Sequence, residues 1–143
     1  MKTLLTLFLA LLVVQILAAQ SSGFTAEKKN AAVDNLTAAI ESENDGLQTS
    51  GATILSDLIK ESYIESNDAS LTLIPLLKML KEGTTDEERI AAAFAIYELD
   101  NKIGIYHLRG VAVFDDNEKV ANVCKNLYYS YHKLHGTEYL VTL

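Results

Sequence analysis

The stretch from Ile74 to Leu99, IPLLKMLKEGTTDEERIAAAFAIYEL, decides the fold class, because it predicts two helices joined by a short turn. Pro75 is tolerated in the first turn of a helix, where backbone amides have no intrahelical partner. Gly83 is typical of the residue that ends a helix. Thr85 and Glu88 have the spacing of a capping box, which starts the second helix. The stretch therefore predicts a helical hairpin.

The second helix of this hairpin has no polar face from Ile90 to Tyr97. A helix that is apolar all round is normally buried by neighbours on several sides. We expect these residues to form the core of the domain, covered by the first, second and last helices. In the alternative, Ile90, Phe94 and Tyr97 line a cavity for a small apolar ligand.

Helical spacing of apolar residues extends over most of the remaining chain. It predicts further helices at residues 25–44, 50–66 and 116–135, with Asp45 and Gly46 expected to end the first. In the last helix, the apolar positions are Val120, Val123, Cys124, Leu127, Tyr131 and Leu134.

Residues 101–114, NKIGIYHLRGVAVF, leave two alternatives open, because two glycines interrupt an apolar segment. The favoured one is a helix that continues from the preceding segment to about Arg109. The rival is a pair of short strands at residues 103–107 and 111–114, where β-branched and aromatic residues cluster.

No proline- or serine-rich linker divides residues 24–143, so we predict a single domain. About 120 residues are enough to enclose one hydrophobic core. The predicted fold class is all-α, a compact bundle of about five helices.

A family resemblance supports the same fold class. The positions that carry it are Ile74-Pro75-Leu76-Leu77, Leu80, Gly83, Asp86-Glu87-Glu88, Ala91 to Ala93 and Leu99. Together, residues 73–99 resemble one helical repeat of the armadillo and HEAT families, in which an apolar helix with an early proline precedes a capped, alanine-rich helix. The resemblance implies stacking of helical hairpins and partner binding rather than catalysis. A stable stack needs at least about three repeats, and no full second repeat is visible.

A shorter similarity links residues 86–91, DEERIA, with residues 116–121, DNEKVA, at a separation of 30. It covers a capped helix start, and the shared physics of helix starts is enough to explain it.

The N-terminus, MKTLLTLFLALLVVQILAAQSSG, has the order of a secretory signal peptide: one positive charge, an apolar run and small residues. We assign residues 1–19 to this signal, with cleavage after Ala19, Ser21 or Gly23. A signal anchor is the alternative, but the run is short for a membrane span of about 20 residues and lacks a positive flank. The predicted location is extracellular, with no stable membrane insertion.

Removing the signal removes Lys2 and no acid, which leaves 11 Lys and Arg against 19 Asp and Glu, a formal charge of −8. This acidic balance argues against nucleic-acid binding, because phosphate contacts need clustered cations. It also disfavours anionic membrane surfaces.

Cys124 is the only cysteine, so the domain has no internal disulfide. The residue falls on the apolar side of its helix, where burial as a free thiol is expected. The alternative is a disulfide-linked homodimer.

Asn35, in the sequence Asn35-Leu36-Thr37, is a candidate N-glycosylation site.

Residue patterns typical of catalysis or metal binding are absent from the sequence. His132, His135 and Glu138 are close in sequence, but a zinc site needs three or four converging ligands, and two histidines at a helix end are the simpler interpretation. A thiol–imidazole pair of Cys124 with His107 or His132 would need an exposed, electropositive cysteine. We predict no enzyme activity and no cofactor.

Two functions therefore remain as hypotheses. The first is a secreted module that binds another extracellular protein, with Tyr129 and Tyr139 as candidate surface contacts because amphipathic rings often anchor interfaces. The second is an extracellular carrier that encloses a small apolar ligand beside Ile90, Phe94 and Tyr97.

Overall fold

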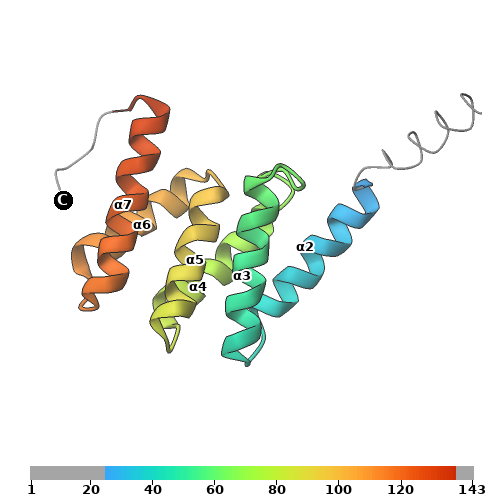
Figure 1. Ribbon diagram of the computed structural model, residues 1–143, viewed down its shortest axis with the longest axis horizontal. Coiled ribbons are helices and arrows are strands. Elements are labelled where there is room, and N and C mark those ends of the chain that lie inside the picture. The colour runs from blue at the N-terminus through green and yellow to red at the C-terminus, as the bar shows by residue number, and fades with distance from the viewer. Residues whose placement is uncertain (1–24, 138–143) are drawn as a thin grey trace, which may run out of the picture.

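A computed structural model describes residues 25–137, which fold into six α-helices and one short 3-10 helix, with no strand among them (Figure 1). The helices are α2 (Ala26–Ile40), α3 (Asp45–Lys60), α4 (Leu73–Glu82), α5 (Asp86–Glu98), α6 (Lys102–Phe114) and α7 (Glu118–His135), with the 3-10 helix η1 (Ser70–Thr72) before α4. The all-α prediction is confirmed, and the expected number of about five helices is one too few. The predicted signal peptide lies outside the described residues.

The additional helix is α6, which covers the stretch that the sequence left ambiguous. Asp100 has a φ of 51°, a left-handed conformation that ends α5. The side chain of Asn101 then accepts a hydrogen bond from the backbone N–H of Ile103 at 2.9 Å and starts a new helix. Asparagine is among the strongest N-cap residues. The helical alternative is confirmed, but α6 is separate from α5 and runs past Arg109, and the strand alternative is wrong.

The boundary between the first two helices also differs from the prediction. Asp45 and Gly46 begin α3 rather than ending the helix before it. The reason is Asn44, whose side chain accepts a hydrogen bond from the N–H of Leu47 at 2.9 Å and caps α3. Its capping preference outweighs the turn signal of the Asp-Gly pair.

The six helices form three consecutive hairpins arranged in a row. Within each hairpin, α2 packs against α3, α4 against α5, and α6 against α7. Helices α3, α5 and α7 also pack side by side in one layer, and α2, α4 and α6 form the layer behind them (Figure 1). The helical bundle is therefore two layers deep, with α2 at one end and α7 at the other.

Polar contacts align the first turns of the three helices in the front layer. The hydroxyl of Thr84, just before α5, donates to the carboxylate of Asp45 at the start of α3 at 2.8 Å. In the same way, the amide of Asn117, just before α7, donates to Asp86 at the start of α5 at 2.6 Å, and this bond lowers the pKa of Asp86. Each hairpin is thus joined to the next at the same end.

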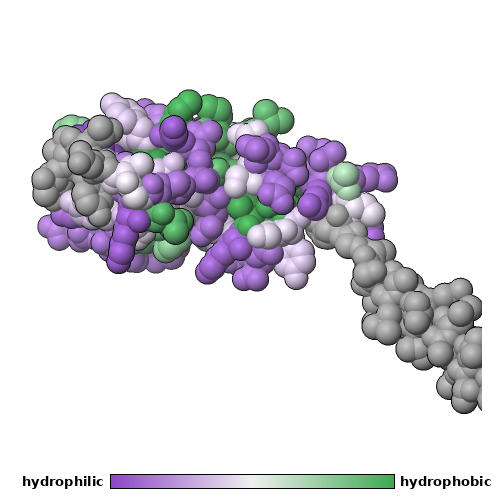
Figure 2. Space-filling view, turned by 90° about the horizontal axis from the view of Figure 1, so that it is seen from above, coloured by the Kyte–Doolittle hydropathy of each residue, from purple (hydrophilic) through white to green (hydrophobic). Residues whose placement is uncertain are grey.

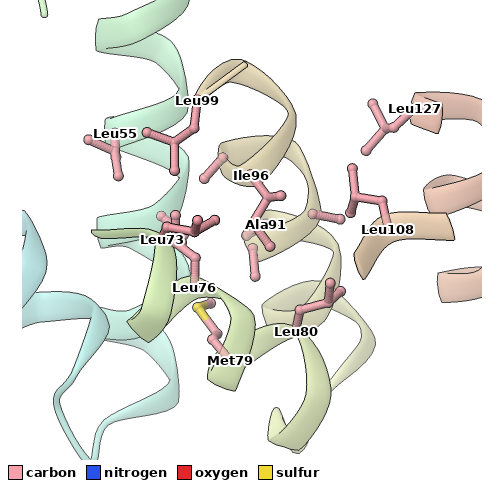
Figure 3. Close-up of a cluster of buried hydrophobic side chains, with 14 of the residues drawn as sticks. Leu55, Leu73, Leu76, Met79, Leu80, Ala91, Ile96, Leu99, Leu108 and Leu127 are labelled. Atoms are coloured by element: carbon pink, nitrogen blue, oxygen red, sulfur yellow. The ribbon is translucent and has the colours of Figure 1, made fainter. Parts of the chain in front are cut away.

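Helix α5 is central because it contacts α3, α4, α6 and α7. Its small side chains, Ala91, Ala92, Ala93 and Ala95, are buried and allow neighbouring helices to approach closely. Around them lie larger apolar side chains from the other helices that point toward one another, among them Leu55, Leu76, Leu80, Leu108 and Leu127 (Figure 3). Full burial of each such side chain stabilises the fold by about 1.5–3 kcal/mol.

The expectation that the first, second and last helices cover α5 on every side is only partly right. Helices α4 and α6, rather than α2, pack on it together with α3 and α7. Phe94 is 45% exposed, because it faces outward between α3 and α7 rather than into the core. Leu134, expected on the apolar side of the last helix, is exposed as well.

Within residues 25–137, no helix combines the length and apolar character needed to cross a membrane.

Candidate interaction surface

Helix α6 is apolar on two opposite sides, and only one of them is covered. Its inner side buries Gly104, Ile105 and Leu108 against the rest of the bundle. Residues spaced three and four apart share one side of a helix, and on α6 this spacing forms a second, outward side. We call it the α6 face; its residues are Ile103, Tyr106, His107, Gly110, Val113 and Phe114.

The α6 face is the largest concentration of exposed apolar side chains on any one helix of the described chain. Eleven large hydrophobic residues are exposed among the described residues, and four of them belong to α6. Tyr106 is 63% exposed and Phe114 is 83% exposed. On the face of the molecule that Figure 2 shows, the surface is mostly hydrophilic, with hydrophobic groups gathered in a few places. Contiguous apolar surface of this kind is typical of interaction sites.

Beside the α6 face, a groove of about 600 Å³ separates α6 from α4. Its apolar lining residues are Ile74, Leu77, Leu80, Val111 and Phe114. Lys78, Lys81, His107 and Asp115 also line it, so this groove combines an apolar floor with polar side chains, two of them lysines. Of the two lysines, neither forms an ion pair within residues 25–137.

The two glycines of α6 have different surroundings. A Cβ at Gly104 would lie 2.7 Å from Cγ2 of Ile96 and 3.2 Å from Cδ1 of Leu73, so glycine is needed there for α6 to pack against α4 and α5. A Cβ at Gly110 would meet no heavy atom within 4 Å. The fold of a single chain therefore gives no packing reason for glycine at position 110.

The C-terminal end of α6 is held by a polar cluster around Arg89 of α5. The Arg89 guanidinium forms a two-pronged ion pair with Asp115, and its Nε donates to the carbonyl oxygen of Leu80 at 2.7 Å. Both charged side chains are mostly buried. The hydrogen bond from Arg89 is the main cause of the lowered pKa of Asp115. This cluster fixes α6 against α4 and α5 and so positions the α6 face.

Two of the three predicted cavity residues lie together in the structure. Phe94 and Tyr97 line an open groove of about 290 Å³ between α3, α5 and α7. Ile90 is partly buried, packs against the core and is not among the residues that line this groove.

The predicted partner-surface tyrosines are not brought together by the described residues. Tyr129 is partly buried against the core, and its ring lies 6.0 Å from that of Tyr128. Tyr139 lies outside the described residues. Asn35 is exposed on α2, where a glycan would be sterically accessible.

Cys124 is fully buried, as predicted, and burial raises the pKa of its thiol to about 12. The thiol is therefore protonated at neutral pH, and a disulfide to another chain would first require the core to open.

At the end of α7, Nε2 of His135 lies 3.2 Å from Asp100, and Nδ1 of His132 lies 2.6 Å from the hydroxyl of Thr137. The part of the chain that the structure describes contains no cluster of three or more side chains suited to hold a metal ion.

Comparisons of the chain with protein-family models, with curated proteins and with solved structures find no match.

The sequence interpretation did not select the α6 face as a candidate site. The signal was present in the spacing of Ile103, Tyr106, Gly110 and Phe114, which repeats every three to four residues. This helical spacing did not decide the structure of α6, because the same β-branched and aromatic residues are also typical of strands.

Proposed function

We propose that this protein is a small, secreted, non-enzymatic interaction module that binds a protein partner through the α6 face. The observation that carries the proposal is the uncovered apolar side of α6, on which Tyr106 and Phe114 are both more than half exposed. Aromatic side chains are enriched among residues that dominate binding energy at interfaces.

The arrangement of the helices supports the same proposal. Three hairpins in a row, with helices of each hairpin packed against the corresponding helices of the next, support the stacking of hairpins that the resemblance of residues 73–99 to a HEAT or armadillo repeat implies. Each hairpin buries its apolar side against the next one, so about three are needed for a stable stack. Stacks of this kind present extended surfaces suited to binding other proteins.

Secretion is part of the proposal and rests on the N-terminal sequence alone. The exposed position of Asn35 on α2 supports use of the glycosylation site in a host that glycosylates secreted proteins. Treatment of the secreted protein with an N-glycosidase would then reduce its mass, and an Asn35→Gln variant would show no reduction.

The function is tested by capture of partners from the fluid into which the protein is secreted, using tagged wild-type protein and two variants. Phe114→Glu places a charge on the α6 face, and Leu134→Glu places the same charge at an exposed leucine on α7. We expect a partner that binds wild type and Leu134→Glu but not Phe114→Glu. Equal capture by both variants, or no capture by wild type, would contradict the proposal.

The carrier function is the second candidate, favoured by the groove that Phe94 and Tyr97 line. Its volume of about 290 Å³ is at the lower end of the range for small-molecule sites. Solvent extraction of the natively purified protein, followed by mass spectrometry, would show a bound apolar compound that a Phe94→Glu variant loses. A protein that yields no such compound would exclude this carrier function.

A further inference from the structure

We infer that the partner of the α6 face is a second copy of this chain, and that two α6 helices cross antiparallel at Gly110 in a symmetric dimer. This inference rests on the proposed function, because it names the occupant of the same surface. Four features of the described residues support it: the glycine at the crossing point, the aromatic residues on either side of it, the charges at the two ends of α6 and the available apolar area.

The first feature is Gly110 itself. Glycine is the least favourable residue in a helix interior after proline, so its presence there needs a reason. The surroundings of Gly110 within one chain give none, because a Cβ would meet no heavy atom within 4 Å. Close approach of a second helix gives one, since glycine lets two backbones come nearer than any other residue.

The second feature is the position of the aromatic residues relative to Gly110. In a symmetric antiparallel crossing, residues at equal distances on opposite sides of the crossing point meet across the interface. Tyr106 precedes Gly110 by four residues and Phe114 follows it by four. Tyr106 of one copy therefore meets Phe114 of the partner subunit, twice in each dimer. Aromatic pairs of this kind add to the stabilisation from buried area.

The third feature is charge. Lys102 lies at the N-terminal end of α6, and the exposed acids Asp116 and Glu118 lie just beyond its C-terminal end. None of these three side chains forms an ion pair within residues 25–137. Antiparallel crossing brings the basic end of each copy to the acidic end of the other, so both ends of the interface are complementary.

The fourth feature is the area available for burial. Aromatic side chains bury about 150–250 Å² each, so the exposed parts of Tyr106 and Phe114 supply about 300 Å² per copy. A standard interface buries about 800 Å² on each partner. Ile103 and Val113 on α6 and Ile74 on α4 are exposed as well and add to this area, which stays below that of a standard interface. This is an interface of modest size, and we expect a dissociation constant of about 10 µM.

Sedimentation of the purified protein, at concentrations from about 1 to about 200 µM, tests the inference. Wild type should change from monomer to dimer over this range, and Phe114→Glu should weaken the dimer at least about tenfold. Leu134→Glu, the matched control on α7, should leave the dissociation constant within about twofold of wild type. Gly110→Ala should weaken the dimer at least about tenfold while the helical circular dichroism of the monomer is retained.

Other outcomes separate this inference from the proposed function. A wild-type protein that stays monomeric at all concentrations, yet captures a different protein in a Phe114-dependent way, overturns the dimer and leaves the interaction surface intact. Lys78 and Lys81 in the groove, which form no ion pair within residues 25–137, would then point to an acidic, partly apolar partner. A monomer with no Phe114-dependent capture overturns both. A dimer that Phe114→Glu and Leu134→Glu affect equally also overturns the inference, because it lies elsewhere on the surface.

Discussion

Replacing each glycine of α6 by alanine, one at a time, should have opposite effects on the stability of the monomer. Alanine is favoured over glycine in a helix interior by about 0.8–1.0 kcal/mol, and this gain applies at both positions. At Gly110, where a Cβ meets nothing within 4 Å, the whole gain should appear. At Gly104, the added methyl group would lie 2.7 Å from Ile96 and 3.2 Å from Leu73, and neither helix can move freely.

Inserting a methyl group into a packed core costs about 1–3 kcal/mol. The Gly104→Ala variant should therefore be destabilised by up to about 2 kcal/mol, after the helix-propensity gain is subtracted. The two variants should differ in their free energies of unfolding by about 1–3 kcal/mol. The assay is urea denaturation followed by far-ultraviolet circular dichroism at about 1 µM, where the monomer predominates. Equal changes of the same sign in both variants would refute the packing of α6 against α4 and α5.

Three further predictions concern the groups that hold the bundle together. Replacing Arg89 by Met should destabilise the fold by about 1–3 kcal/mol in urea denaturation, because it leaves Asp115 and the carbonyl of Leu80 without their mostly buried donor. The pKa of Asp115 is lowered in the folded protein, so its contribution to stability is complete above its unfolded pKa and is lost as the pH falls below about 4. A pH series should show a smaller acid-side loss in Arg89→Met than in wild type. The Cys124 thiol should react with an aromatic disulfide reagent only after unfolding, because it is buried and protonated, and rapid reaction of the native protein would contradict its placement in the core.

The start of α5 could be predicted from the sequence. Thr85 accepts a hydrogen bond from the N–H of Glu88 at 3.2 Å, as the capping-box spacing indicated. The carboxylate of Glu88 accepts from the N–H of Thr84 at 2.8 Å, one residue before the expected partner. Local side-chain chemistry decides this helix start, so the sequence alone was sufficient there.

The arrangement of the hairpins could not be predicted, because it depends on contacts between residues far apart in the chain. The similarity of residues 86–91 and 116–121 was attributed to the shared physics of helix starts. In the structure these segments begin α5 and α7, which occupy corresponding positions in successive hairpins. The spacing between corresponding helix starts varies along the chain, from Asp45 to Asp86 and from Asp86 to Glu118, and this irregularity hid the repeat from a search for a fixed period.

The α6 face was missed for a different physical reason. An outward apolar side has the same composition as an inward one, so the residues on α6 could be recognised as apolar but not as uncovered. Phe114 and Leu108 illustrate the difficulty, since the first is 83% exposed and the second fully buried on the same helix. Only the positions of α4, α5 and α7 determine which of the two sides remains open.

Cysteine trapping beside the proposed crossing point tests whether the α6 face is where this protein binds a second copy of itself. The variant carries both His107→Cys and Val113→Cys, because these exposed positions lie three residues before and after Gly110 and meet across an antiparallel crossing that keeps the glycine. The control is Ser50→Cys at an exposed position on α3, and the buried Cys124 does not compete. Under mild oxidation at about 10 µM, we expect the double variant to form a dimer that reductant dissolves, and Ser50→Cys to remain monomeric. A double variant that stays monomeric, or that dimerises no faster than Ser50→Cys, would show that the two α6 helices do not meet.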